Sequence, residues 1–295
     1  MALLRRVLLV SNPASRRGAR FHAHAIAAFR AVGAECDAVL TEAPGHGGEI
    51  ASQLASSYDA VFTLGGDGTA TEVIGALAGR GVPVGILPGG TGNLLARYLR
   101  IPLDIDRAVR ALVAGTTRHM DLGRLPSGRA YAYSAGVGVD ATMVAETSPA
   151  LKRLLGMPAY MLAATRAVLQ ARLFDVRAVV DGTVYERQAS AVYVANQPHV
   201  LGGRVTFGPG IRNDDGLLDL CVYTPRTPAD AVRIMWKLYR GDFRPDPALF
   251  FARGATFDVE ATPTQLAQAD GELLGAGPLR VQVEPAGAFL LKPAM

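Results

Sequence analysis

The sequence predicts an α/β domain built on a parallel sheet, followed by a C-terminal β-sandwich domain. Over the first 120 residues, apolar strand segments alternate with helical segments at regular spacing, which is typical of βαβ units. Beyond about Thr117 the segments become short and alternate in polarity, as the strands of an antiparallel sandwich do. Polar or glycine-rich loops follow three of the first four strands, at the sheet edge where α/β proteins bind ligands.

Each element of the first domain follows from a local pattern. Short runs of Val, Leu, Ile and Ala indicate buried strands, and longer segments with a helical spacing of apolar residues indicate helices. The expected strands are 7–10, 37–41, 60–64 and 84–87. The expected helices lie near 20–32, 47–57, 69–78, 93–99 and 104–114. Right-handed crossovers would join these strands into one parallel sheet.

The second domain is read from its short alternating runs. These predict strands at 130–137, 176–180, 191–195, 217–223, 256–260 and 279–283, with two helices near 158–171 and 228–240. The apolar segment 289–291 is expected to return to the first domain. We therefore expect a first domain of residues 1–121 with a returning tail of about 286–295, and a second domain of residues 122–285.

Composition excludes several classes of protein. With 49% hydrophobic residues, a chain of 295 residues can bury the cores of two domains. The longest charge-free stretches, 81–96 and 188–203, hold 16 residues each, fewer than the ~20 apolar residues of a membrane span, so a cytoplasmic protein is expected. The net charge of +4 favours visits to anionic lipid at the inner face of the membrane, without the basic, aromatic-rich stripe of a nucleic-acid binder. Two cysteines without C-x-x-C spacing predict neither a disulfide framework nor a zinc site.

Residues 61–69, V-F-T-L-G-G-D-G-T, indicate a site for a nucleotide polyphosphate. Glycines let the backbone turn tightly and bring its N–H groups against a ligand, and the N-terminus of the following helix favours phosphate. A carboxylate would repel bare phosphate, so Asp67 fits the loop if Mg²⁺ lies between them. The alternative is an ordinary strand-to-helix turn with Asp67 as the helix N-cap.

Other phosphate-binding motifs do not match. A P-loop needs a lysine after its glycines, whereas none of the three lysines lies in the first 151 residues. A Rossmann fingerprint follows the first strand, whereas this loop follows the third, and Thr71 stands at the position of its last glycine. A dinucleotide oxidoreductase is therefore disfavoured.

Four further segments add polar groups. N-P-A-S at Asn12 and P-G-G-T-G-N at Pro88 follow the first and fourth strands, where both could contact phosphate or form plain turns. N-D-D-G at Asn213 is either a hairpin turn or a source of hard oxygen ligands for Mg²⁺. In D-G-E, Asp270 and Glu272 would share one face of a strand.

In the order and spacing of these motifs, which cover nearly the whole chain, the sequence resembles the diacylglycerol kinase catalytic-domain family, the bacterial soluble lipid kinases related to sphingosine and ceramide kinases. The resemblance implies a nucleotide domain like that of NAD kinase and phosphofructokinase. It also implies a β-sandwich lipid domain, with the active site in the cleft between the two.

Carried over position by position, the resemblance assigns roles to particular residues. Nucleotide contacts fall on Asn12, Thr41, Gly65, Gly66, Asp67, Gly68, Thr69, Ala70, Thr71 and Thr91. Asp270, or Glu272 as the other candidate, would be the base toward the lipid hydroxyl. A Mg²⁺ on the second domain would use Asp215 and the carbonyls of Arg212 and Leu217, and Asp121 would link that metal to the active site.

The resulting expectation is an ATP-dependent lipid kinase that phosphorylates diacylglycerol or a related lipid in phospholipid metabolism. NAD kinase also carries G-G-D-G, but it calls for an N-x-G-x-L-G-F-like segment where this chain has P-G-G-T-G-N. A catalytically silent lipid-binding or regulatory protein on the same fold is the alternative from another class. The chain departs from the family pattern at Thr71 and Leu94, where Asn and an acidic residue are usual, and this leaves the lipid open. The helix near 158–171 either faces the core or borders the acyl site.

Overall fold

The computed structural model describes residues 4–15, 17–138, 172–200 and 205–294. The expected helix near 158–171 lies outside these residues. The chain divides into two compact units, one holding the described residues up to Met120 and from Ala286 onward, the other those between Asp121 and Pro285. None of the described helices is long and apolar enough to cross a membrane.

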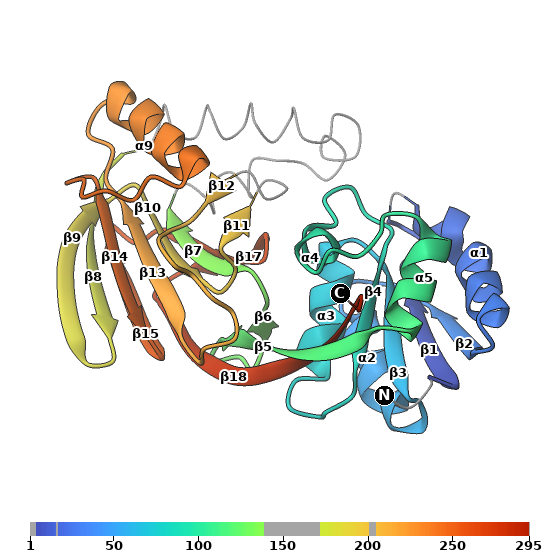
Figure 1. The fold of residues 1–295 in the computed structure, drawn as a ribbon. Coiled ribbons are helices and arrows are strands. Elements are labelled where there is room, and N and C mark those ends of the chain that lie inside the picture. The colour runs from blue at the N-terminus through green and yellow to red at the C-terminus, as the bar shows by residue number, and fades with distance from the viewer. Residues whose placement is uncertain (1–3, 16, 139–171, 201–204, 295) are drawn as a thin grey trace. The chain divides into compact units, whose positions relative to one another are not determined.

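The first unit is built on a parallel sheet with the strand order β2-β1-β3-β4 (Figure 1). Its strands are β1 (Arg6–Ser11), β2 (Glu35–Leu40), β3 (Ala60–Gly65) and β4 (Val84–Pro88). Its helices are α1 (Gly18–Ala31), α2 (His46–Leu54), the short η1 (Ala55–Ser57), α3 (Asp67–Ala76), α4 (Leu94–Tyr98) and α5 (Ile105–Val113). All the expected elements of this unit are present, with ends that differ by a few residues.

The strand order fixes where the helices pack. The chain passes from β1 to β2 in one direction along the sheet, and from β2 to β3 and on to β4 in the other. Because parallel crossovers are right-handed, α1 covers one face, next to α5, while α2 and α3 cover the other face together. Strands β3 and β4 are buried along their whole length, as expected for a sheet covered on both faces.

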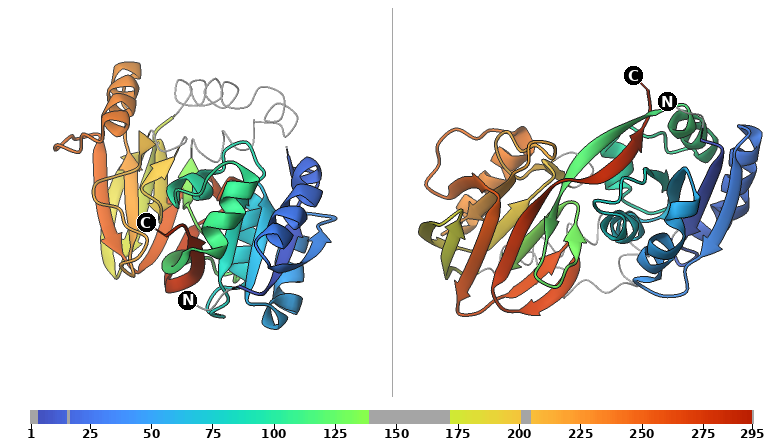
Figure 2. Two further views of the ribbon diagram at one scale, coloured as in Figure 1. Left: turned by 45° about the vertical axis from the view of Figure 1, so that its right-hand side comes forward. Right: turned by 90° about the horizontal axis from the view of Figure 1, so that it is seen from below.

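The second unit is a sandwich of two largely antiparallel sheets, as the sequence predicts (Figure 2). One sheet has the order β14-β13-β10-β7-β16-β17, and the other includes β18, β15, β8 and β9, with β5 joined to β18 and β6 joined to β5. The strands are β5 (Thr116–Arg124), β6 (Ala130–Tyr131), β7 (Ser134–Gly138), β8 (Phe174–Val180), β9 (Thr183–Ala189), β10 (Ala191–Ala195), β13 (Leu218–Tyr223), β14 (Leu249–Gly254), β15 (Thr256–Thr262), β16 (Leu266–Ala269), β17 (Glu272–Ala276) and β18 (Leu279–Lys292). Alternate residues of both sheets, such as Val192 and Leu220 from one and Val176 and Phe257 from the other, form the core.

Outside these sheets, a small pair of strands, β11 (His199–Val200) and β12 (Val205–Thr206), lies against helix α9 (Pro228–Arg240). Thr227 and Asp230 form a capping box at the start of α9, Pro228 occupies its first turn, and Gly241 ends it in the left-handed conformation. These sequence signals explain why α9 agrees with the expected helix at both ends.

Two expectations about strands change. The expected strand 130–137 is wrong as one element, because it breaks into β6 and β7 at Ala132 and Tyr133, whose N–H groups bind the Asp270 carboxylate. The expected strand 279–283 and the returning segment 289–291 are parts of the single long strand β18, which pairs with β15 and, at Leu290, with Val84 of β4.

Candidate functional site

The first cluster of predicted residues lies where the direction of chain travel in the parallel sheet reverses. Strands β1 and β3 are neighbours, and the chain leaves them in opposite directions along the sheet. In α/β sheets, ligands bind at the carboxyl ends of such a pair of strands. Asn12 follows β1 and Asp67 follows β3. The side-chain amide of Asn12 donates to Thr69 Oγ1 at 3.0 Å, and therefore ties the two loops together across this point.

The loop after β3 presents a helix N-terminus. Helix α3 begins at Asp67, with Gly66 as its N-cap residue, so Asp67 is an acidic residue of the first turn and not the cap. Thr69 and Thr71 are buried, and Thr71 Oγ1 donates back to the Asp67 carbonyl at 3.0 Å. Gly68 is exposed, and a side chain added there would meet no atom within 4 Å. The outer face of the loop is therefore open to a ligand.

The loop after β4 packs directly on the loop after β3. A Cβ on Gly90 would stand 2.6 Å from Gly66 Cα, so only glycine permits this approach. The Asn93 side chain accepts a hydrogen bond from the Gly90 N–H at 2.9 Å and donates one to the Gly90 carbonyl at 3.0 Å. Asn93 is the N-cap residue of α4, but its side chain bonds to Gly90 and makes no capping hydrogen bond. Instead, Asp67 Oδ1 accepts the Leu95 N–H of α4 at 3.3 Å.

The remaining nucleotide candidates lie around these two loops. Thr41 directly follows β2, is nearly buried, and donates its N–H to the Ser11 carbonyl at 2.9 Å. Gly65 ends β3, and its carbonyl accepts the Gly89 N–H at 3.0 Å. Ala70 is buried in α3, whereas Thr91 is exposed in the loop after β4. Side chains and backbone groups from four consecutive strands thus gather at one edge of the sheet.

In the second unit, Asp270 and Gly271 form the two-residue turn between β16 and β17. Both have positive φ, 48° and 80°, as expected for an Asp-Gly hairpin turn. The Asp270 carboxylate accepts N–H groups of Ala132 at 2.7 Å, Tyr133 at 2.9 Å and Ser134 at 3.1 Å. Three backbone donors stabilise the charge of this carboxylate and hold the hairpin against the start of β7.

Tyr131, next to this cluster, stays neutral. Complete burial, and then the Asp270 charge, raise the pKa of its hydroxyl well above its usual value. The hydroxyl donates to the Val194 carbonyl at 3.0 Å, so the ring is a fixed wall of the core beside Asp270.

Glu272 is placed differently from Asp270. It begins β17, is exposed, and pairs with Arg129 at 2.9 Å between Nη2 and Oε2. The expectation that the two carboxylates share one face of a strand is wrong, because Asp270 lies in the turn and not in the strand. Arg129 also donates to the Ala269 carbonyl at 3.4 Å. Through Arg129, Glu272 is therefore linked to the other strand of the same hairpin, beside the turn.

The predicted metal residues gather around the loop before β13. Asp121 is buried, accepts the Gly216 N–H on Oδ2 at 2.7 Å, and donates its own N–H to the Asn213 carbonyl at 2.7 Å. Asp215 Oδ1 accepts the Leu217 N–H at 3.3 Å. The side chain of Arg212 points to Asp214, at 3.1 Å, which leaves only its carbonyl to consider as a ligand.

Arg253, which the sequence analysis did not single out, is the main cation of this loop. Its guanidinium lies 3.0 Å from Asp219 Oδ1, 3.3 Å from Asp215 Oδ2 and 2.7 Å from the Gly210 carbonyl. Burial raises the pKa of Asp219, and the contact with Arg253 opposes that rise. In the absence of a ligand, Asp215 thus has Arg253 as its counter-ion. Within the described residues, no group of three or more His, Cys, Asp or Glu side chains is arranged to hold a metal ion.

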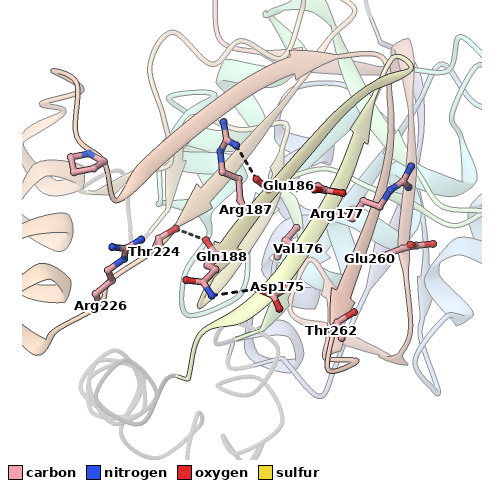
Figure 3. A pocket seen from close by; sticks show the side chains of 11 residues that line it. Asp175, Val176, Arg177, Glu186, Arg187, Gln188, Thr224, Arg226, Glu260 and Thr262 are labelled. Atoms are coloured by element: carbon pink, nitrogen blue, oxygen red, sulfur yellow. Dashed lines mark hydrogen bonds between the residues drawn. The ribbon is translucent and has the colours of Figure 1, made fainter.

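A pocket of about 600 Å³ lies elsewhere, over β8 and β9 (Figure 3). Its lining mixes both charges, with Asp175 and Glu186 beside Arg177 and Arg187. Gln188 donates to Asp175 at 3.3 Å, one of several contacts among the lining residues themselves. None of the predicted site residues lines it, so we place the site at the sheet edge described above.

Comparison with known proteins agrees with this geometry. A family model of the diacylglycerol kinase catalytic domain matches residues 6–125, and a model of the YegS C-terminal NAD kinase beta sandwich-like domain matches residues 133–291. The crystal structure of a diacylglycerol kinase from Bacillus anthracis has the same fold, with a TM-score of 0.76 over 99% of this chain and 98% of that one at 20% identity.

Curated relatives cover most of the sequence. A probable lipid kinase, YegS-like, from Pseudomonas aeruginosa is 34% identical over 92% of this chain and 89% of its own length. A diacylglycerol kinase from Bacillus subtilis is 26% identical over 93% of this chain and 92% of its length. An uncharacterized protein from Synechocystis is 29% identical over 79% of this chain, which spans 54% of that relative. Both halves of the fold and the full-length relatives agree, and the chain belongs to the diacylglycerol kinase and YegS-like family of lipid kinases.

Proposed function

We propose that this protein transfers the γ-phosphoryl group of ATP to the hydroxyl of a lipid, diacylglycerol or one closely related to it. The observation that carries the proposal is the edge of the sheet at the carboxyl ends of β1 and β3, where a glycine loop, a helix N-terminus and Asp67 lie together. Such a site offers N–H groups and a positive helix end to phosphate oxygens. The family membership supports phosphoryl transfer as the reaction.

Asp67 would hold a Mg²⁺ ion together with the nucleotide phosphates. When bound, Mg²⁺ neutralises the negative charge that develops on the transferred group. The donor set fits such an ion, because Asp67 lies beside the open outer face at Gly68. Asp67 also binds the Leu95 N–H, so the position of this carboxylate is set by α4 before any nucleotide arrives.

Asp270 is proposed to accept the proton of the lipid hydroxyl, with Glu272 as the alternative. The pKa of a lipid alcohol, like that of water, lies far above the pKa of an ordinary carboxyl group, ~3.9. Asp270 could therefore only orient the hydroxyl and take its proton as the new P–O bond forms. The N–H groups of Ala132, Tyr133 and Ser134 fix the orientation of this carboxylate.

We also propose a second Mg²⁺, held by Asp215 and the carbonyls of Arg212 and Leu217, with Asp121 as a link. To bind this ion, the Asp215 carboxylate would have to give up its contact with Arg253. The second ion would fix the loop that Asp121 already binds through the Gly216 N–H.

The experiment that tests the function is transfer of labelled phosphate from ATP to a panel of lipids, separated by thin-layer chromatography. Labelled lipid that disappears in Asp67→Asn would support the proposal. Label appearing in NADP when NAD is supplied, and in no lipid, would favour the NAD kinase alternative.

A further inference from the structure

Helix α9 carries an exposed apolar stripe. Its inner side, formed by Ala231, Ile234 and Leu238, is buried against the second unit. Four large apolar residues at helical spacing remain exposed along its other side: Val232 by 71%, Met235 by 38%, Trp236 by 61% and Tyr239 by 54%. We call these four side chains the α9 stripe. The helix stands at the margin of the second unit in both views of Figure 2.

The stripe combines two aromatic rings with a neighbouring cation. Trp236 and Tyr239 stack with their ring centroids 5.9 Å apart, and Arg240 lies 6.0 Å from the Trp236 ring. The capping box and Gly241 hold the helix in place before it meets any partner. Trp and Tyr, with an apolar body and a polar tip, are the side chains that membrane–water interfaces favour.

The charges beside the stripe suit an anionic partner. Arg233 pairs with Asp230 at 2.6 Å and also with Asp246, which Lys237 approaches at 3.5 Å. These ion pairs neutralise Asp230 and Asp246, and Arg244 pairs with Asp242 in the same loop. Arg240 borders the stripe through its contact with Trp236. An anionic surface would meet this cation beside the stripe, and a cation near the surface contributes to binding such a membrane.

We propose that the α9 stripe docks the protein on the surface of an anionic lipid bilayer. The choice of a bilayer rests on the proposed function, because a lipid kinase must reach a substrate held in a membrane. A second copy of the chain is a poorer occupant, since a helix of 13 residues is only about 20 Å long. Four side chains do not cover the ~800 Å² per partner of a stable dimer, whereas an interfacial helix needs only to enter the lipid by ~5–10 Å.

The chain supplies its own probe, because Trp236 is its single tryptophan. Wild-type protein is mixed with vesicles of equal parts phosphatidylglycerol and phosphatidylcholine, and with vesicles of phosphatidylcholine alone. We expect the emission to shift to shorter wavelength and to be quenched by brominated lipid, more strongly with the anionic vesicles. Emission that stays unshifted and unquenched at saturating anionic lipid would overturn the proposal.

Substitution locates the contact. Val232→Asp places a charge on the stripe at its most exposed position and leaves the probe intact. We expect vesicle affinity to fall by about tenfold, the effect of no longer burying one valine side chain. Val184→Asp, on β9 and 48% exposed, is the control and should bind as the wild type does. Equal affinity for Val232→Asp and wild type would overturn the proposal, as would a loss of self-association in Val232→Asp with no loss of vesicle binding.

The docking test does not depend on turnover. If the wild type binds anionic vesicles but phosphorylates no lipid, docking stands and the proposed function falls. If it phosphorylates a short-chain, water-soluble diacylglycerol but shows no vesicle binding, the proposed function stands and docking falls.

Discussion

Replacing Asp270 by Asn separates a structural role from a catalytic one. The amide keeps one acceptor oxygen, which can still serve the N–H groups of Tyr133 and Ser134. Its NH₂ group then faces the Ala132 N–H that the carboxylate receives at 2.7 Å. One donor loses its acceptor and the other bonds lose their charge assistance. At about 1–3 kcal/mol for an unpaired buried group, and with Asp270 only partly buried, we expect a loss of roughly 2 kcal/mol in unfolding free energy.

The β8–β9 hairpin offers a matched control in Asp181. Its turn is also Asp-Gly, with φ of 47° at Asp181 and 83° at Gly182. The Asp181 carboxylate accepts the N–H of Ala255 at 2.9 Å and the N–H and hydroxyl of Thr256 at 2.8 and 2.9 Å. Asp181 is exposed, so Asp181→Asn should lose less unfolding free energy than Asp270→Asn in urea unfolding, without any effect on the chemical step.

Turnover then separates the two hairpins. The assay is run at a temperature at which both variants are folded. If Asp270 is the base, Asp270→Asn should lower kcat by a factor of roughly 10² to 10⁴, with nucleotide affinity within a few-fold of wild type. Asp181→Asn should keep the wild-type kcat. Equal activity of the two Asn variants would refute the assignment. Loss of turnover in Glu272→Gln alone would transfer the role to Glu272.

The remaining predictions concern the nucleotide, the second metal and acid stability. Asp67→Asn should abolish turnover and weaken Mg²⁺-dependent ATP binding in calorimetry, since an amide replaces an anionic ligand; unchanged affinity and turnover would remove Asp67 from the site. Mg²⁺ should raise the melting temperature of wild type but not of Asp215→Ala, by mass action on the native state, and equal shifts would place the ion elsewhere. Hydrogen bonds, the Ala255 N–H first among them, lower the pKa of Asp181. The contribution of Asp181 to stability is therefore present above its unfolded-state pKa of ~3.9 and is lost as pH falls through its lower folded-state pKa. The stability gap between wild type and Asp181→Asn should therefore close in acid, and a gap that widens there would contradict the sign.

The order of elements and the sheet edge at which the candidate residues gather could be predicted because both depend on local patterns. Short apolar strands bounded by glycine loops give the βαβ order, and the rule for parallel sheets then gathers Asn12 and Asp67 at one edge. Pro228 and Gly241 mark the ends of α9 in the same local way. In each case the residues that decide the structure lie within a few positions of the element.

The contacts that sequence patterns missed join residues far apart in the chain. Asp270 breaks the expected strand 130–137 from 138 positions away, through the Ala132 N–H. Arg253 reaches Asp215 from 38 positions away. A charged residue on a strand is usually interpreted as solvent-exposed, so the residues next to Arg253 in the sequence do not indicate its pairing with Asp215. Asn93 occupies the N-cap position of α4, but its backbone is left-handed and its side chain bonds to Gly90 instead of to the helix.

The most direct test of the central claim is transfer of labelled γ-phosphate from ATP to diacylglycerol and related lipids by wild type and Asp67→Asn, with NAD as a competing acceptor. The account predicts labelled lipid with wild-type protein and Mg²⁺, and none with the variant. Absence of label from every lipid, or equal labelling by both proteins, would contradict it.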